Sequence, residues 1–417
     1  MSTEHAASLS DSFSTSLRGL DSSDENYVPD LVAAILRDAR QHRASDIHLV
    51  PTEERLLMQW RIDGVLHSIA AFDSDLSPRI VARFKVLAGL LTYRTDLPQE
   101  GRISAAGSQS HEGEVRVTTF PTLFGEKAAV RLFADVDHFQ MLNDLGLPDD
   151  VEAGLAHQLQ STSGVVLLTG PSGSGKTTTV YACMRELVRM HGSEKGLMSL
   201  EDPIEVVVPG VTQSQVRLNV GFDLATGLKS MMRQDPDVIM VGEIRDPATA
   251  ECAFQAALTG HLVVTTFHAG SSVEAVTRLL DMGIEPYLLR STLRAIVCQR
   301  LLRRACDACM NGQSKSKIRG TSDDSVEKTD KRDGLVNRSG SCSVCGGLGY
   351  HGRFVTAELL DPEDPGVSKG IIERFDSRSL QSIANAAGTV TLRERAERAV
   401  SDGLTWPEEV FRVLGNK

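Results

Sequence analysis

The stretch Gly170-Pro171-Ser172-Gly173-Ser174-Gly175-Lys176-Thr177 decides the fold. It fits the pattern GxxxxGK[ST], in which glycines let backbone amides turn inward around phosphates and Lys176 neutralises the terminal ones. Thr177 occupies the position whose hydroxyl binds Mg²⁺ in this pattern. Thr178 begins the segment with helical character that follows the loop. An apolar run precedes the loop at 165–169, and 178–190 has helical character. The sequence therefore predicts the strand, loop and helix that a nucleotide phosphate site requires.

Three polar side chains follow apolar runs further along the chain, where open α/β sheets place their ligands. Glu243 ends the run 238–242 and is a candidate for the acid on the metal side. Glu201 follows 196–200 and could orient or deprotonate a water, with Glu205 of the same acidic cluster as the next candidate. His268 ends the run 262–267 and could sense a γ-phosphate, although a structural, hydrogen-bonded histidine is an equal alternative.

The rest of the chain divides into a large domain that contains this loop and a small domain that precedes it. From about 151 to 417, apolar strands alternate with helical patterns, which predicts a parallel sheet covered on both faces. Residues 27–135 read as a small α+β domain with a hairpin turn at Asp63-Gly64, and 136–150 as a linker. Residues 1–26 are rich in serine and acidic groups with few aliphatic side chains, and we expect a disordered tail.

Four of the seven cysteines form two CxxC pairs, Cys306 with Cys309 and Cys342 with Cys345. Two such pairs can place four thiolates around Zn²⁺, and a redox dithiol is the weaker alternative. The polar stretch 310–341 between the pairs reads as an insertion that can loop out at little entropic cost. The remaining cysteines lie singly in apolar or helix-like segments and are expected to be buried thiols.

Composition excludes several classes of protein. A hydrophobic content of 41% and a charged content of 24% are typical of a soluble globular protein. The formal charge of -11 disfavours a protein that coats nucleic acid, because that function needs a basic face. The sequence has neither an apolar run long enough to span a membrane nor a signal peptide, so we expect a cytoplasmic protein.

The order of these motifs resembles that of the secretion ATPase superfamily, specifically the type II secretion and type IV pilus assembly ATPases, from Ala44 to about Leu360. The motifs that carry the resemblance are the Walker A loop 170–178, the Asp box 201–205, the Walker B segment 235–246, the His box 259–269, and the N-terminal phrases 44–48, 61–64, 97–102 and 115–119. Phe267 and Ala269 depart from the residues that the family usually has beside the histidine.

The resemblance implies a RecA-like P-loop domain preceded by a small PAS-like α+β domain, with ATP and Mg²⁺ bound between them in a homo-hexamer. By analogy, Glu201 is the water-orienting base, Glu243 the magnesium-side acid, and Arg102 and Arg116 close on the phosphates. Surface salt bridges are the alternative for these two arginines. Such arginines make physical sense, because a guanidinium that arrives when the site closes stabilises charge on the transferred phosphoryl group.

The cysteine module resembles that of assembly-type rather than retraction-type ATPases, so we expect a motor on the cytoplasmic side of a type II secretion or type IV pilus assembly machine. Its expected partner is the inner-membrane platform protein, which would bring it peripherally to the membrane. The extra N-terminal domain with which many relatives dock is not recognisable. A RecA-type nucleic-acid motor and a non-hydrolysing scaffold are the alternatives, and the acidic charge and the intact motif residues disfavour them.

Overall fold

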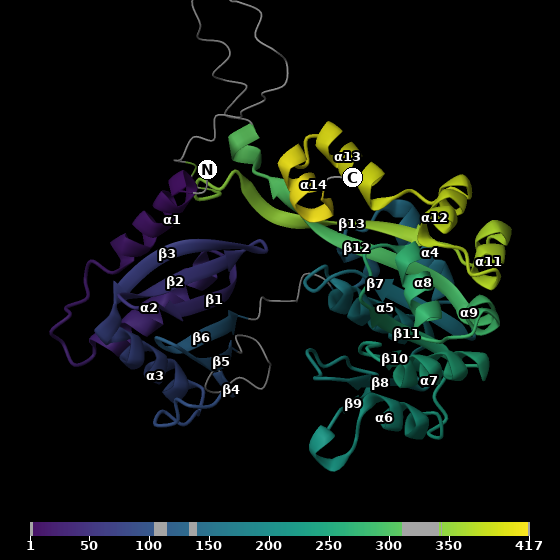
Figure 1. Cartoon of the computed structure of the whole chain (residues 1–417), viewed down its shortest axis with the longest axis horizontal. Helices are drawn as coiled ribbons and strands as arrows, with labels where there is room; N and C mark the ends of the chain where they lie inside the picture. Colours follow the sequence, from purple (N-terminus) through teal and green to yellow (C-terminus); the bar gives the residue numbers. More distant parts are fainter. Residues whose placement is uncertain (1–2, 104–114, 133–139, 311–341, 343, 416–417) are drawn as a thin grey trace, which may run out of the picture. The chain divides into compact units, whose positions relative to one another are not determined.

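The computed structural model describes residues 3–103, 115–132, 140–310, 342 and 344–415, with backbone only for 3–8 (Figure 1). The chain forms two compact units. Unit 1 contains 1–136 and 303–353, and unit 2 contains 137–302 and 354–417. Among the described residues, none of the helices combines the length and the apolar character needed to cross a membrane.

Unit 1 is built on a six-stranded sheet with the order β3-β2-β1-β6-β5-β4. Neighbouring strands pair antiparallel throughout. The expected turn at Asp63-Gly64 joins β2 to β3, and both residues have the positive φ angles, 48° and 85°, that a tight hairpin needs. The elements of this unit are α1 (Thr3–Ser16), α2 (Tyr27–Gln41), β1 (Ala44–Pro51), β2 (Arg55–Ile62), β3 (Val65–Asp73), the 3₁₀ helix η1 (Ser74–Leu76), α3 (Ser77–Leu87), β4 (Gln99–Ile103), β5 (Val115–Thr122) and β6 (Gly125–Leu132).

The N-terminal segment differs from the disordered tail that the sequence suggested. Residues 3–16 form helix α1, and its Leu9 and Phe13, one helical turn apart, are buried in the core of unit 1. The Phe13 ring stands edge-on to the Trp60 ring with 5.7 Å between centroids. These two large apolar side chains dock a helix that is otherwise built of alanines and polar residues.

The segment 303–353 also differs from the expected boundary, which placed it in the ATPase domain. Leu348 packs in the core of unit 1. The Gly352 N–H donates to Asp63 Oδ2 over 3.0 Å, and Arg353 pairs with the same carboxylate. The carboxylate beside the β2–β3 turn thus ties the cysteine module to the small domain. Most of the predicted insertion at 310–341 lies outside the described residues.

Unit 2 is built on a seven-stranded sheet with the order β13-β12-β7-β11-β10-β8-β9. The pairs from β12 through β9 are parallel, as the alternation of strands and helices predicted. The strands are β7 (Gly164–Thr169), β8 (Leu197–Glu201), β9 (Thr212–Gln215), β10 (Val238–Val241), β11 (Leu262–Phe267), β12 (Leu293–Ala305) and β13 (Tyr350–Leu360). The helices are η3 (Leu142–Asp144), α4 (Asp149–Gln158), α5 (Lys176–His191), η4 (Leu218–Val220), α6 (Leu224–Met231), α7 (Pro247–Leu258), α8 (Ser272–Asp281), α9 (Pro286–Thr292), α11 (Pro365–Ile372), α12 (Ser377–Ala386), α13 (Leu392–Ser401) and α14 (Pro407–Leu414).

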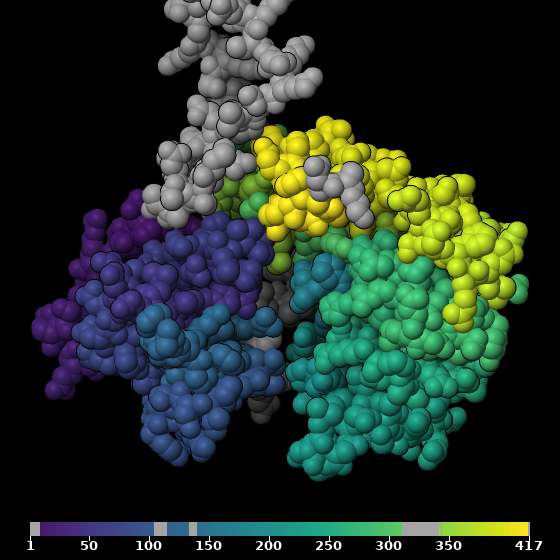
Figure 2. All heavy atoms as spheres, in the orientation of Figure 1, coloured from purple at the N-terminus to yellow at the C-terminus, as the bar shows by residue number. Residues whose placement is uncertain are grey.

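Both faces of this sheet are covered, because β7 is buried at every position. Val165 and Leu167 belong to a core with α7, α8 and α9, whereas Val166 and Leu168 belong to a second core with α4 and α5. Leu142 and Leu147, from the expected linker 136–150, are buried in the second core. The C-terminal helices, in yellow in the space-filling view, cover one side of unit 2 (Figure 2).

Candidate active site

The phosphate loop connects β7 to α5 as predicted. Gly170, Gly173 and Gly175 all have positive φ angles, which a side chain would strain. A Cβ on Gly170 would also meet Ser174 Oγ at 2.5 Å and the Gln299 carbonyl at 2.6 Å. The Gln299 side chain donates to the Ser174 carbonyl over 2.9 Å, a support from β12 that the sequence analysis missed. The loop therefore keeps a shape that only glycine permits, at the N-terminus of a helix.

Lys176 begins α5, and only 8% of the residue is exposed. Its Nζ donates to the carbonyl oxygens of Gly170 and Pro171, over 2.8 and 3.0 Å. Burial lowers the pKa of the Lys176 amine, and the Glu243 carboxylate acts in the opposite direction. Thr177 follows at the start of the same helix and is exposed, as a magnesium-binding hydroxyl must be.

A chain of charged contacts leads from the phosphate loop to the neighbouring strands. His268 Nδ1 lies 3.1 Å from the Gly170 carbonyl and 3.5 Å from Lys176 Nζ. His268 Nε2 lies 2.5 Å from Glu243 Oε1, and Arg245 Nε donates to Glu243 Oε2 over 2.8 Å. The structure thus brings together Lys176, Glu243 and His268, three of the candidate site residues.

Arg245 extends this chain and was not singled out from the sequence. Its Nη1 lies 3.4 Å from Asp202 Oδ2, so one guanidinium joins the acid that ends β10 to the acidic cluster after β8. The signal was present, since an arginine two residues after a strand-end glutamate can fold back on it. Arg278 also supports the site, because it donates to the His268 carbonyl and lies over the Phe267 ring, at 5.3 Å.

Glu201 does not join this chain. Only 2% of the residue is exposed, and its carboxylate accepts hydrogen bonds from Tyr181, Ser199 and Gln213. A water-orienting base needs an oxygen open to the nucleotide, so the geometry differs from the role expected of Glu201. Glu205, the alternative acid of the cluster, is exposed.

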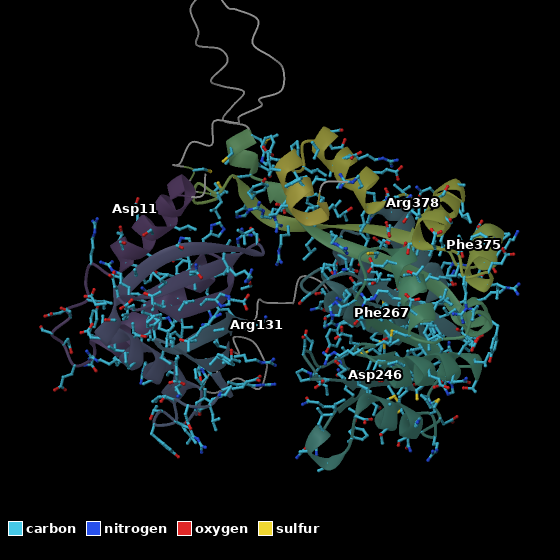
Figure 3. The ribbon with its side chains drawn as sticks, viewed as in Figure 1. Asp11, Arg131, Asp246, Phe267, Phe375 and Arg378 are labelled. Carbon is cyan, nitrogen blue, oxygen red and sulfur yellow. The ribbon has the colours of Figure 1, made fainter. Side chains whose placement is uncertain are left out.

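Arg102 and Arg116 lie directly opposite each other on β4 and β5 of unit 1. Residues in direct register share one face of a sheet, and the register continues to Arg131 on β6 and Asp46 on β1. Arg116 pairs with Glu100 and Arg131 with Asp46, at 3.4 and 3.0 Å. The two predicted arginines are therefore the start of a row of charged side chains, in which Arg131 was missed (Figure 3).

The four cysteines of the CxxC pairs gather in unit 1, with all Sγ atoms within 4.8 Å of one another. Cys306 Sγ lies 3.9 Å from Cys342 Sγ, and Cys309 Sγ lies 3.5 Å from Cys345 Sγ. Tetrahedral coordination with Zn–S bonds of about 2.3 Å separates sulfurs by roughly 3.8 Å. These thiols are free rather than disulfide-bonded, so the donor set fits a metal ion such as Zn²⁺.

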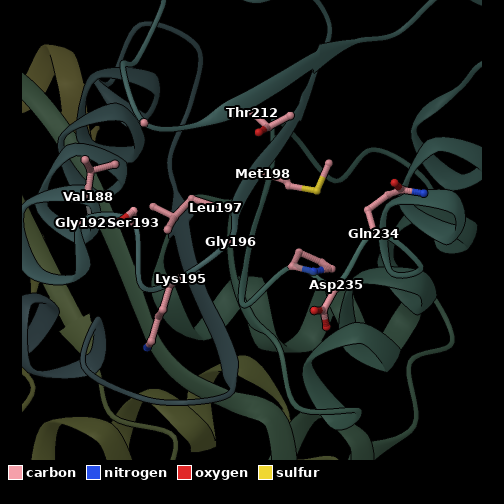
Figure 4. Close-up of a pocket in the computed structure, with 12 residues that line it drawn as sticks. Val188, Gly192, Ser193, Lys195, Gly196, Leu197, Met198, Thr212, Gln234 and Asp235 are labelled. Atoms are coloured by element: carbon pink, nitrogen blue, oxygen red, sulfur yellow. The ribbon is translucent and has the colours of Figure 1, made fainter.

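A pocket in unit 2 lies away from the nucleotide loop, at the amino end of β8 (Figure 4). Its lining includes Leu197, Met198 and Thr212, with Gln234 and Asp235 from the turn before β10. Ligands of parallel sheets bind at the carboxyl ends of strands. This pocket is therefore not the candidate active site.

Comparisons with known proteins agree with the motif order. A family model described as type II/IV secretion system protein matches residues 21–412. The type II secretion system protein HxcR of Pseudomonas aeruginosa is 38% identical over 94% of this chain and 79% of its own length. The type II secretion system ATPase E of Vibrio cholerae is 38% identical over 94% and 76%, and the type IV pilus assembly ATPase PilB of Myxococcus xanthus is 38% identical over 94% and 68%.

Solved structures show the same fold. The ATPase DotB of Legionella pneumophila matches with a TM-score of 0.66 at 20% identity, over 95% of this chain and 98% of its own. The pilus retraction motor PilT with bound ADP matches with a TM-score of 0.57 at 24% identity, over 91% and 95%. The α/β fold expected from the sequence is confirmed, whereas the PAS-like character of the small domain stays a prediction.

Proposed function

Because the chain belongs to the type II/IV secretion system protein family, we propose that it is the hexameric motor of a type II secretion or type IV pilus assembly machine. The chain is an ATPase, since relatives 38% identical to it over most of its length bear that name. The observation that carries the proposal is the chain of contacts from Lys176 through His268 to Glu243, which connects the phosphate loop to the acid that follows β10.

In this proposal the backbone of 170–178 surrounds the phosphates of ATP, and Lys176 neutralises them. Thr177 and Glu243 would hold Mg²⁺, which would neutralise charge on the phosphate oxygens when bound. His268 lies between Lys176 and Glu243, where it can report the γ-phosphate to the acid. We assign the water-orienting role to Glu205 rather than to Glu201, because Glu201 is buried inside the domain whereas Glu205 is exposed.

Arg102 and Arg116 complete the site in the proposed motor. Both lie on the polar face of the unit 1 sheet, and a guanidinium can bind a phosphoryl group through two parallel hydrogen bonds. We propose that they reach the nucleotide when a hexamer assembles and closes. The cysteines 306, 309, 342 and 345 would hold Zn²⁺ as a structural ion. The motor would act on the cytoplasmic side, held at the inner membrane by the platform protein of its machine.

The proposal is tested by measuring ATPase activity and molar mass together over a range of protein concentrations. If the site is completed by a second subunit, specific activity rises in step with hexamer formation. A monomer of constant specific activity would contradict the hexameric mechanism and leave the ATPase intact. Stimulation by DNA at moderate salt would favour a nucleic-acid motor instead.

A further inference from the structure

The Tyr181 hydroxyl joins the helix of the phosphate loop to the acidic cluster. Tyr181 lies on α5, five residues after Lys176, and only 3% of it is exposed. Its Oη donates to Glu201 Oε2 and accepts from the backbone N–H groups of Glu205 and Val206, over 3.0 and 3.3 Å. One oxygen atom thus fixes the backbone of Glu205 against the helix that begins at the phosphates.

Gln213 on β9 holds the other side of the same segment. Its Nε2 donates to Glu201 Oε1 over 2.9 Å and to the Val206 carbonyl over 3.0 Å. Its Oε1 accepts from the Val208 N–H over 2.7 Å. The backbone of 205–208 is therefore tied to two side chains, and both side chains donate to the Glu201 carboxylate.

We propose that Tyr181 and Gln213 are positioning residues for ATP hydrolysis, which hold the acidic loop 202–208 against α5 with Glu201 as their buried anchor. This inference rests on the proposed role of that loop in hydrolysis. Glu201 is the group on which the two donors converge, and a buried carboxylate with satisfied oxygens is a rigid anchor.

The physical reason lies in how little displacement a hydrolytic site tolerates. A shift of about 1 Å in an acid that orients water can cost about a hundredfold in rate. Asp202 contacts Arg245, and the Tyr181 and Gln213 hydrogen bonds fix the backbone that follows it. Burial and the Glu201 carboxylate raise the pKa of Tyr181, so its hydroxyl keeps the proton that it donates.

The test is Tyr181→Phe in the full chain, which removes one oxygen and keeps the ring in its site. We expect kcat for ATP to fall about tenfold, while the dissociation constant for ATP changes by less than about twofold. The acidic limb of the pH–kcat profile keeps its position, since a positioning residue does not itself titrate. The control is Thr292→Val, which removes another buried hydroxyl of unit 2, bonded to the Leu288 carbonyl at 2.6 Å.

Gln213→Leu is the second variant and keeps the inference testable if Tyr181→Phe does not fold. It should lower kcat in the same way, and the double variant should lose less than the two single losses multiplied together, because both residues hold one loop. A kcat within about twofold of wild type in both single variants, or equal losses in the Thr292→Val control, overturns the inference. If Lys176→Ala retained activity, the nucleotide site itself would be misassigned, which is a different failure.

Discussion

Glu201 is the last residue of β8, Glu243 comes two residues after the neighbouring parallel strand β10, and the surroundings of the two acids are opposite. Leu200 lies beside Val241 in the register, so Glu201 is level with Gly242 and Glu243 lies one position further along the chain. Glu201 is 2% exposed, and its partners are the neutral donors of Tyr181, Ser199 and Gln213. Glu243 has 16% of its side chain exposed and lies between Arg245 and His268. The position of each acid relative to the strand end and the partners of its carboxylate together distinguish the buried Glu201 from Glu243 beside His268.

The largest effect should come from the residue that begins the charged chain. Lys176→Ala should lower kcat by about 10³-fold or more, because it removes the fixed positive charge at the terminal phosphates. Steady-state ATPase assays measure this loss. Lys195→Ala, which changes a lysine lining the pocket away from the loop, is the matched control and should keep normal turnover.

The comparison between the two glutamates is sharpest when each becomes glutamine. Glu243→Gln should lower kcat about 10²-fold at little cost in stability, because the amide keeps the shape and loses the charge. Glu201→Gln should instead lower stability by about 1–3 kcal/mol, since three donors converge on its carboxylate and a glutamine amide cannot accept from all of them. Denaturant unfolding and kcat, measured on both variants, separate the two effects.

The reverse pattern would remove the distinction between the two acids. If Glu201→Gln unfolded like the wild type, lost turnover and lost the acidic limb of its pH–rate profile, Glu201 would be the base. Glu205→Gln is the companion variant, and under the present assignment it loses turnover without losing stability.

These two glutamates also show what the sequence could and could not give. Apolar runs and glycine spacing were enough to predict the parallel sheet and the phosphate loop, and they singled out Lys176, Glu243 and His268 separately as candidates. The direction in which the Glu201 carboxylate points was not readable, because it depends on Tyr181 and Gln213, which are distant in sequence. Local patterns reveal which residues end a strand, whereas long-range hydrogen bonds decide which way they face.

The structure differs from the sequence predictions for the N-terminal segment and for the cysteine module, and the two differences have the same cause. Helix α1 docks through Leu9 and Phe13, and composition averaged over 1–26 hid these two side chains. The cysteine module was assigned to the ATPase domain by its place in the chain, but Leu348 and the contacts with Asp63 attach it to the small domain. Composition gives the average character of a segment, and a few tertiary contacts can override it.

A smaller effect is expected for the arginines of unit 1 than for Lys176, because they act only when the site closes. Arg102→Ala or Arg116→Ala should lower kcat by about 10²-fold while ATP affinity changes little. Lysine at either position should rescue poorly, since a point charge cannot reproduce the bidentate fork. Arg55→Ala, an exposed arginine at the start of β2, is the control. Unchanged rates in both variants would leave hydrolysis to unit 2 alone.

The smallest effect on turnover should come from the cysteine site, which lies in a different unit from the phosphate loop. Cys309→Ser removes one of four converging thiols, so bound zinc, about one ion per chain in the wild type, should be lost. The expected result is a lower melting temperature of unit 1, because a structural metal adds its binding energy to folding, with kcat per folded chain within about twofold of wild type. Elemental analysis, thermal unfolding and ATPase assays on one preparation measure the three quantities. Cys252→Ser is the matched control, since that thiol is buried in α7 of unit 2 and its loss should leave the zinc content unchanged. Zinc retained in Cys309→Ser would contradict the tetrathiolate site, and a kcat that falls with the metal would show that the cysteine module takes part in turnover.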